Sequence, residues 1–464
     1  MLTGAPWFDD HGKTSCVILA PVTEVCKLDA PAGARLGGGA WATVGLFPPA
    51  PSRCDFGCLN NTRSKGSQQM LCRRWVAALL IPFAPLLFAS ACNTAQEQAA
   101  TAENVEAPVA SMEPLPEALA FLASLAGVFI PADVDAQSAS PKPIELVATS
   151  PHQWTGIGVA SSGRIYVNFP RWSDEVPISV GYLRDNGSVL PFPDADWNSW
   201  EPGEEDFTDR FVAVQSVVAT GDDVWVLDTG RPRFGTILPG APRLFRFDGD
   251  GRKLAEYPAD GVVKPNSYLN DVRFSQDGSR AYITDSGAGG LVVIDLETGA
   301  AHRALDRHPS TMATGTRVVI DGTPWGSDDN PPKVHADGIA LFGEHLYYQA
   351  LTARTLYRVP LELLEEDVSY ETRAAAVEAV AEVGPSDGLI AGPDGSIYLS
   401  SLEHNAVRVL RPDGATEVVA QDPLIAWPDS FSFGPDGALY VTTSRIHQGP
   451  VPPAPYGVLR IPLR

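Results

Sequence analysis

From residue 142 onward, one pattern of hydrophobic and polar positions recurs along the chain. A turn is followed by a short apolar strand whose second, third or fourth residue is aromatic, and then by a cluster of small or polar residues. The aromatic residues lie 42 to 65 positions apart, which is the spacing of propeller blades with long inserted loops. The six copies are GRIYVNFP (163–170), DDVWVLDTG (222–230), SRAYITDSG (279–287), EHLYYQALT (344–352), GSIYLSSLE (395–403) and GALYVTTSR (437–445).

Each copy has an apolar strand before it and an alternating strand after it. Three strands with period-two alternation and a fourth at the edge predict a four-stranded antiparallel blade. Six such blades around an axis predict an all-β, six-bladed β-propeller over residues 141–464. The last copy has no outer strand after it, so residues 144–149 (IELVAT) are expected to supply that strand and close the ring.

The first strand of every blade should face the central channel, so equivalent residues on these strands form a ring. Counting back 10 or 11 positions from each aromatic residue predicts this ring: Thr155, Gln215, Asp271, Asp337, Asp387 and Asp429. Asn270, His335, Ser386 and Ser430 add polar groups at the same level. Crowded carboxylates repel one another, so they stay ionised only near a cation, an amine or several N–H donors.

Three interpretations of the acidic ring stay open at this point. Each Asp could cap the adjacent backbone and hold the blades in register. The carboxylates with Asn270 could supply oxygen ligands to Ca²⁺ or another divalent metal. With aromatic residues such as Trp154, Trp427 and Phe431, they could also form a pocket for an organic cation.

Other chemistry is mostly excluded. Residues 141–464 contain no GxxxxGK[ST], HExxH or CxxC motif. His335, Asp337 and Asp387 are the candidate catalytic residues, and His404 is a further acid–base candidate. The chain has 34 Lys plus Arg against 56 Asp plus Glu, a net charge of −22, which argues against a nucleic-acid partner.

The N-terminal part is predicted to contain an export signal followed by a tether. Arg73 and Arg74 precede an apolar stretch, 75–91, that Pro82 and Pro85 interrupt. Residues 70–92 are therefore expected to be a signal peptide, and 1–69 a mis-annotated, disordered upstream extension. Ala89–Cys92 resembles a lipobox, with Cys92 as the lipid anchor, and it also satisfies the A-x-A rule for soluble release. Residues 93–140 suggest a flexible tether with one short helix.

Several long motifs resemble the yellow and major royal jelly protein family. The family has an aromatic-rich FPRW segment followed by Val-Pro, as in GRIYVNFPRWSDEVPISVGYL, and the similarity continues through VAVQSVVATGDDVWVLDTG and WPDSFSFGPDGALYVTTSR. This resemblance implies a secreted six-bladed propeller related to catecholamine chemistry and dopachrome conversion. It also implies a site for an amine at one mouth of the channel. The last blade would contribute Ser430, Phe431, Ser444 and Arg445 to that site, although TTSRI stands where insect relatives typically have Leu-Ser-Asn after the strand.

A more distant resemblance is to the gluconolactonase and regucalcin propellers, through SDGL (386–389) and ADGI (336–339). It implies a divalent metal held by Asn270, Asp337 and Asp387, with the metal activating water for lactone hydrolysis. The Glu expected near the first strand is absent, and Thr155 occupies the equivalent place.

Together these observations predict an exported, monomeric protein, either soluble or anchored to a membrane only through an N-terminal lipid. Its small-molecule site is expected to bind an aromatic amine or a catechol-like ligand, with dopachrome-type isomerase activity as one extension. The alternatives are a metal-dependent lactonase-type hydrolase and a non-catalytic interaction module that uses the long loops 185–211 and 306–334.

Overall fold

The computed structural model describes residues 141–327 and 329–464. The predicted extension, signal peptide and tether (1–69, 70–92 and 93–140, with Cys92) lie outside the described residues. Within the described part of the chain, no helix is long and apolar enough to cross a membrane.

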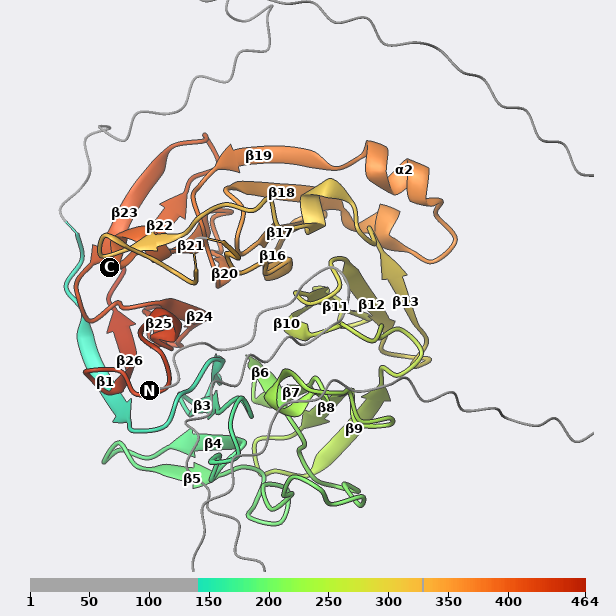
Figure 1. Cartoon of the computed structure of the whole chain (residues 1–464), viewed down its shortest axis with the longest axis vertical. Coiled ribbons are helices and arrows are strands. Elements are labelled where there is room, and N and C mark those ends of the chain that lie inside the picture. The colour runs from blue at the N-terminus through green and yellow to red at the C-terminus, as the bar shows by residue number, and fades with distance from the viewer. Residues whose placement is uncertain (1–140, 328) are drawn as a thin grey trace, which may run out of the picture. The chain divides into compact units, whose positions relative to one another are not determined.

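Six four-stranded antiparallel sheets surround a central axis, as the view down that axis shows (Figure 1). The predicted six-bladed propeller is therefore confirmed. Blade 1 consists of β2 (Ile157–Val159), β3 (Ile165–Asn168), β4 (Val180–Leu183) and β5 (Val189–Pro191). Blade 2 consists of β6 (Val214–Thr220), β7 (Asp223–Asp228), β8 (Arg243–Phe247) and β9 (Lys253–Pro258). Blade 3 consists of β10 (Leu269–Phe274), β11 (Arg280–Asp285), β12 (Leu291–Asp295) and β13 (Ala301–Ala304).

The second half of the ring repeats this order until the last blade, which takes its outer strand from the start of the described chain. Blade 4 consists of β16 (Ala336–Phe342), β17 (His345–Ala350), β18 (Thr355–Pro360) and β19 (Glu378–Glu382). Blade 5 consists of β20 (Leu389–Ala391), β21 (Ile397–Ser401), β22 (Ala406–Leu410) and β23 (Thr416–Gln421). Blade 6 consists of β24 (Pro428–Phe433), β25 (Leu439–Thr443), β26 (Tyr456–Ile461) and β1 (Glu145–Ser150). β1 pairs antiparallel with β26, so the predicted closing strand is confirmed, shifted by one residue.

Short helices and one hairpin lie in the connections between the strands of the propeller. The hairpin of β14 (Val319–Ile320) and β15 (Thr323–Pro324) lies in the long connection between blades 3 and 4. The helix α2 (Tyr370–Ala375) begins after Ser369, whose side chain caps it by accepting from the Thr372 backbone N–H. The 3₁₀ turns are η1 (Pro232–Phe234), η2 (Pro309–Thr311), η3 (Leu361–Leu364), η4 (Leu402–His404) and η5 (Ile446–Gln448).

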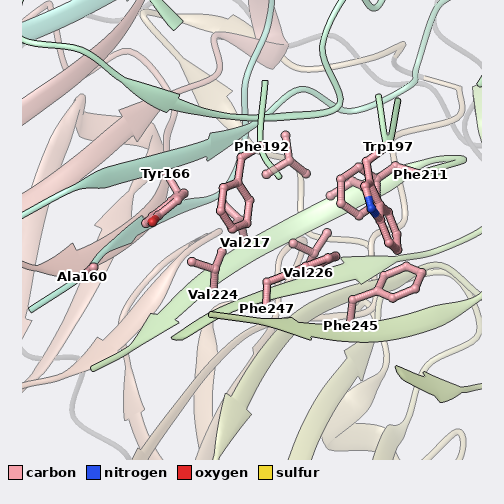
Figure 2. Packing of buried hydrophobic residues seen from close by; sticks show 12 residues of the cluster. Ala160, Tyr166, Phe192, Trp197, Phe211, Val217, Val224, Val226, Phe245 and Phe247 are labelled. Carbon is pink, nitrogen blue, oxygen red and sulfur yellow. The ribbon is translucent and has the colours of Figure 1, made fainter. Parts of the chain in front are cut away.

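Apolar side chains fill the spaces between neighbouring blades. Figure 2 shows the cluster between blades 1 and 2, where Phe192, Trp197 and Phe247 meet edge to face. These rings are buried, and each large aromatic side chain contributes a few kcal/mol through the apolar area removed from water. The alternating residues of each blade thus hold the six inner strands at fixed positions around the axis.

The inner strands β2, β6, β10, β16, β20 and β24 contact one another in sequence around the whole ring. In β6, β10, β16 and β24 the pairing register shifts near the start of the strand, as at a β-bulge. Most of the predicted ring residues lie at these irregular strand starts. The fold therefore collects their side chains at one end of the channel.

Candidate functional site

A pocket lies at the end of the channel where the inner strands begin. It combines a polar floor from the strand starts with aromatic walls from the surrounding loops. The lining residues are Trp172, Gln215, Phe234, Tyr268, Asn270, Ser286, Trp325, Lys333, Val334, Asp337, Leu351, Asp387, Trp427, Asp429 and Ile446.

Three carboxylates from blades 4, 5 and 6 form the acidic part of the floor. Asp337, Asp387 and Asp429 are all buried. The side chains of Asp337 and Asp387 interact directly with each other. The Ser430 hydroxyl donates to Asp429 Oδ1 over 3.2 Å. We call these three residues the acidic cluster.

Glycines allow the carboxylates to come so close together. A Cβ atom on Gly338 would lie 2.1 Å from the carbonyl oxygen of Asp387, and one on Gly388 would lie 2.1 Å from that of Asp429. Neither glycine has a positive φ, so the requirement comes from the close approach of two backbones. The Asp-Gly pairs at these strand starts therefore set the distance between neighbouring blades at the site.

Replacing Gly388 by Ala is expected to lower the free energy of unfolding by about 1–3 kcal/mol, because backbone cannot yield to an added methyl group. Urea denaturation of the full chain would measure the change. Gly261→Ala is the matched control, since nothing lies within 4 Å of its Cβ position and its φ is ordinary. Equal stability of the two variants would contradict the proposed packing role.

A chain of hydrogen bonds crosses the pocket and ends on the acidic cluster. Trp172 Nε1 donates to Tyr268 Oη over 2.7 Å, and Tyr268 Oη donates to Gln215 Oε1 over 2.7 Å. Gln215 Nε2 donates to Asn270 Oδ1 over 3.0 Å, and Asn270 Nδ2 donates to Asp337 Oδ2 over 2.6 Å.

The donor on the other side of the pocket is Trp427, whose Nε1 donates to Asp387 Oδ2 over 2.6 Å. Every donor in this network thus points toward the pair Asp337 and Asp387. Hydrogen bonds to a carboxylate are shorter and stronger than neutral ones, which fits the two 2.6 Å distances.

Burial raises the pKa of all three carboxyl groups well above its ordinary value, and neighbouring carboxylates raise it further. Burial also raises the pKa of Asp271, although its neighbour Arg273 favours the charged form. Arg273 itself reaches across the axis, and its Nη2 donates to the Leu389 carbonyl oxygen over 2.7 Å. The acidic cluster therefore holds protons at a pH where ordinary carboxyl groups are ionised.

Two groups of aromatic side chains form the walls. On one side, Phe234 stacks on Trp172 with ring centroids 5.7 Å apart and lies 5.1 Å from the ring of Tyr268. On the other, Trp325 meets Trp427 edge to face at 4.7 Å. Such walls present flat apolar surfaces and π-faces that suit a ring or an organic cation.

Trp325 reaches the pocket because the β14–β15 hairpin extends to blades 5 and 6. The Val319 backbone N–H donates to Glu403 Oε1, and Asn405 Nδ2 donates to Asp321 Oδ1. The hairpin and Trp427 share one buried apolar cluster. This long connection thus forms one wall of the pocket.

The strand register places five of the six counted residues at equivalent positions and Asp271 one position further along. In each blade the ring residue lies three positions before the inner-strand residue that faces the aromatic residue of the next strand. In blade 3 Arg273 faces Tyr282, which places Asn270 in the ring and Asp271 one position further along. Asp271 does not line the pocket and accepts a hydrogen bond from Ser216 Oγ.

Several other predicted site residues lie outside the pocket lining. Thr155 donates to the Gln215 carbonyl oxygen, which ties blade 1 to blade 2. Phe431 belongs to the apolar core between blades 5 and 6. Ser430 contacts Asp429, Ser444 is buried, and Arg445 donates to the Pro455 carbonyl oxygen.

The histidine candidates are also held by neighbours. His335 Nδ1 accepts from the Ala313 backbone N–H over 2.9 Å, and His404 Nδ1 lies 3.0 Å from Ser401 Oγ. Neither lines the pocket. Sequence reasoning missed Trp172, Phe234, Tyr268, Trp325 and Lys333. Their common signal is position: they precede a first strand or follow a second strand, at the same end as the ring.

The donor set as oriented does not fit a preformed metal centre. Asn270 turns its amide N–H toward Asp337, and its oxygen already accepts from Gln215. Asp337 and Asp387 interact with each other directly. Over residues 141–327 and 329–464, no group of three or more His, Cys, Asp or Glu side chains is arranged to hold a metal ion. The predicted metal ligands Asn270, Asp337 and Asp387 are adjacent but form a hydrogen-bonded network.

Comparisons with known structures found matches at low sequence identity. The chain is similar to a gluconolactonase from Xanthomonas campestris, with a TM-score of 0.45 and 15% identity over 70% of this chain and 91% of that one. It is also similar to the calcium-binding protein regucalcin from Agrobacterium tumefaciens, with a TM-score of 0.43 and 14% identity over 71% and 98% of the two chains.

Sequence comparisons point to one family. The chain is 24% identical to Protein yellow of Drosophila melanogaster over 306 residues, which are 60% of this chain and 52% of that protein. Protein yellow of Drosophila subobscura is also 24% identical, over 49% of its length. The chain therefore spans about half the length of the curated relatives it matches. Residues 212–441 match the model of the major royal jelly protein family, and the chain is similar to the yellow proteins over the lengths given above.

Proposed function

We propose that the pocket binds a small aromatic amine or a catechol-like amine at the mouth of the channel. The observation that carries this proposal is the buried acidic cluster of Asp337, Asp387 and Asp429 beneath aromatic walls. Buried carboxylates are stabilised by a cation that hydrogen-bonds to them. An ammonium group supplies both the charge and three N–H donors.

The walls would hold the ring of such a ligand. Trp172 and Phe234 on one side, and Trp325 and Trp427 on the other, offer flat surfaces above the carboxylates. A ring between them would remove apolar surface from water, while the ammonium group would lie near the floor. The site would therefore select ligands that carry a ring and a positive charge a short distance apart.

The paired carboxyl groups favour one further activity, an isomerisation of the dopachrome type. One ionised carboxylate of the pair would take a proton from a carbon of the ligand, and the protonated partner would donate a proton to a ligand oxygen. The exchange leaves the number of atoms and electrons in the ligand unchanged. Asp337 and Asp387 would have these roles, since they interact directly and line the pocket.

Calorimetric titration of the full chain with tyramine would test the binding proposal. Tyramine is expected to bind, and 4-hydroxyphenethyl alcohol, which carries a hydroxyl group in place of the ammonium, is expected to bind more weakly. Asp387→Asn keeps acceptors and donors for Trp427 and Asp337 but removes the charge. It should weaken tyramine binding at least tenfold, as loss of a charged hydrogen bond of about 1.5–3 kcal/mol implies.

Asp413→Asn is the matched control, because Asp413 is exposed and accepts only the Ala415 backbone N–H in its turn. Its affinity for tyramine should equal that of the unmodified protein. Equal affinities for tyramine and the alcohol, or an unaffected Asp387→Asn variant, would count against the acidic cluster as an amine site.

A further inference from the structure

We propose that Tyr268 is a positioning residue that determines which kind of cation the pocket accepts. Its hydroxyl group sets the direction of the hydrogen-bond chain that runs from Trp172 to Asp337, and that direction keeps a divalent metal out of the floor. The inference deepens the function proposed above. It rests on that function for one point, namely that an organic cation is the ligand admitted instead.

The first donor of the hydrogen-bond chain fixes the direction of all the others. An indole N–H can only donate, so Tyr268 Oη accepts from Trp172 and has its own O–H proton left to donate. That proton goes to Gln215 Oε1, which leaves Gln215 Nε2 to face Asn270 Oδ1 over 3.0 Å. The amide nitrogen of Asn270 then lies on the other side, where it donates to Asp337 Oδ2 over 2.6 Å.

Asn270 therefore presents its amide nitrogen, and not its oxygen, to the acidic cluster. The same nitrogen also donates to the Ser286 hydroxyl over 3.2 Å, and Asn270 Oδ1 is turned toward Gln215. Hard cations such as Ca²⁺ bind oxygen atoms, and the positive end of an N–H bond repels them. A metal that bridged Asn270 and Asp337 would need an oxygen where this N–H group lies.

Neither amide can reverse alone. A side-chain amide has one accepting end and one donating end, so a reversed Asn270 would set its N–H groups against those of Gln215. If Gln215 reversed as well, its N–H would point at Tyr268 Oη, which already accepts from Trp172. The Tyr268 proton would then lose its acceptor at a buried position, which is unfavourable. Tyr268 thus opposes the arrangement that brings Asn270 Oδ1 toward Asp337.

Tyr268 is itself held in place by its neighbours. Its backbone N–H donates to Asp285 Oδ1 over 2.9 Å, and its carbonyl oxygen accepts from the Ser286 backbone N–H over 3.0 Å. Its ring lies 5.1 Å from the ring of Phe234 in the wall. The hydroxyl group is therefore fixed, and the two amides adopt the direction that it sets.

An ammonium group is not excluded in this way. It donates N–H groups to carboxylate oxygens and needs no oxygen from Asn270. Ca²⁺ needs about six to eight oxygen ligands, so the loss of the Asn270 oxygen weakens a metal site on the same carboxylates. The hydrogen-bond chain therefore favours an organic cation over a divalent metal.

Calorimetric titration of Ca²⁺ into the metal-stripped full chain tests the positioning role. The unmodified protein is expected to give no binding heat up to about 1 mM Ca²⁺, the weak end of natural calcium sites. Tyr268→Phe removes the bias, because either direction of Gln215 then leaves one polar group unpaired. Its affinity for Ca²⁺ should exceed that of the unmodified protein by about tenfold or more, as relief of one unpaired buried donor implies.

Gln215→Leu is the second variant, and it tests the same hydrogen-bond chain with Tyr268 intact. Leucine has a similar size and no charge, and it breaks the link between Tyr268 and Asn270. Asn270 can then turn its oxygen toward Asp337 without opposing another amide. This variant should also gain affinity for Ca²⁺, and loss of stability alone would produce no such gain.

Tyr348→Phe is the matched control. Tyr348 is buried like Tyr268, but its hydroxyl lies 2.7 Å from Ser310 Oγ, and neither residue lines the pocket. This variant should respond to Ca²⁺ as the unmodified protein does. Equal Ca²⁺ affinities for Tyr268→Phe and the unmodified protein would overturn the role of Tyr268, whatever Gln215→Leu does. Failure of tyramine to bind would overturn only the amine function, because the Ca²⁺ titrations do not depend on it.

Discussion

Replacing Asp285 by Asn is expected to lower the free energy of unfolding by about 3–5 kcal/mol, because it breaks a buried ion pair. Asp285 ends the second strand of blade 3 and is completely buried. Its Oδ2 atom accepts from Arg303 Nη1 over 2.9 Å and from the Ser267 hydroxyl. An Asn amide at that position would point N–H groups at two donors, and the Arg303 charge would lose its partner.

The substitution should also disturb the pocket. Asp285 Oδ1 accepts the backbone N–H groups of Tyr268 and Ala288, both over 2.9 Å. Tyr268 is the second link of the hydrogen-bond chain that ends on Asp337. Urea denaturation would measure stability, and near-ultraviolet circular dichroism would report on the aromatic walls.

Asp306→Asn is the control for this prediction. Asp306 binds the same Arg303 through Oδ1 at 2.6 Å, but a third of its side chain is exposed. Exposed ion pairs contribute about 0–1 kcal/mol, so this variant should remain close to the unmodified protein. If both variants lost the same stability, the buried position of Asp285 would not be the cause.

The pH dependence provides a second check on Asp285. Burial opposes its charge, but Arg303 and the N–H donors outweigh burial and hold the pKa of Asp285 below its ordinary value. A lowered pKa gives stability that is present above the unfolded-state pKa and is lost as pH falls through the folded-state pKa. The difference between the unmodified protein and Asp285→Asn should therefore shrink in acid.

The acidic cluster should give the opposite dependence. Burial and neighbouring charge raise the pKa of Asp337, Asp387 and Asp429, so the folded protein binds more protons than the unfolded chain near neutral pH. That stability is complete below the unfolded-state pKa and is lost as pH rises through the folded-state values. The unmodified free protein should lose up to about 1.4 kcal/mol per pH unit for each proton released.

Denaturation of Asp387→Asn over the same pH series would isolate this effect. The variant has one buried acid fewer, so its free energy of unfolding should fall less steeply with rising pH and exceed that of the unmodified protein in alkaline solution. Asp413→Asn should follow the unmodified protein. Parallel profiles for all three proteins would mean that Asp387 is ionised in the free fold.

The blades were predictable because their signal is local and repeated. An aromatic strand, its neighbours and the turns between them recur six times, so alternation alone predicts the sheets and even the closing strand. Five of the six counted residues share equivalent register positions for the same reason. The count selected Asp271 in place of its neighbour Asn270 because the first hairpin of blade 3 is longer than the others, and a count along the chain does not show which residues face each other.

The walls could not be predicted in the same way. Trp172, Phe234 and Trp325 lie on loops that differ from blade to blade, so no repeat points to them. Phe431 and Trp154 have the right chemistry and lie near the ring in sequence, but packing places them in blade cores. Side-chain direction in the last blade likewise depends on backbone conformation, as at Arg445, whose φ is +48°.

The pairing of β1 with β26 has a consequence for how the protein is made. A ribosome releases β1 long before β26, so the nascent chain must carry an unpaired outer strand through the synthesis of five blades. Asp429 belongs to the blade that this pairing completes, and it contributes to the acidic cluster. The blade that carries Asp429 can therefore close only after β26 has been synthesised, which makes the finished pocket depend on the pairing of two strands far apart in the sequence.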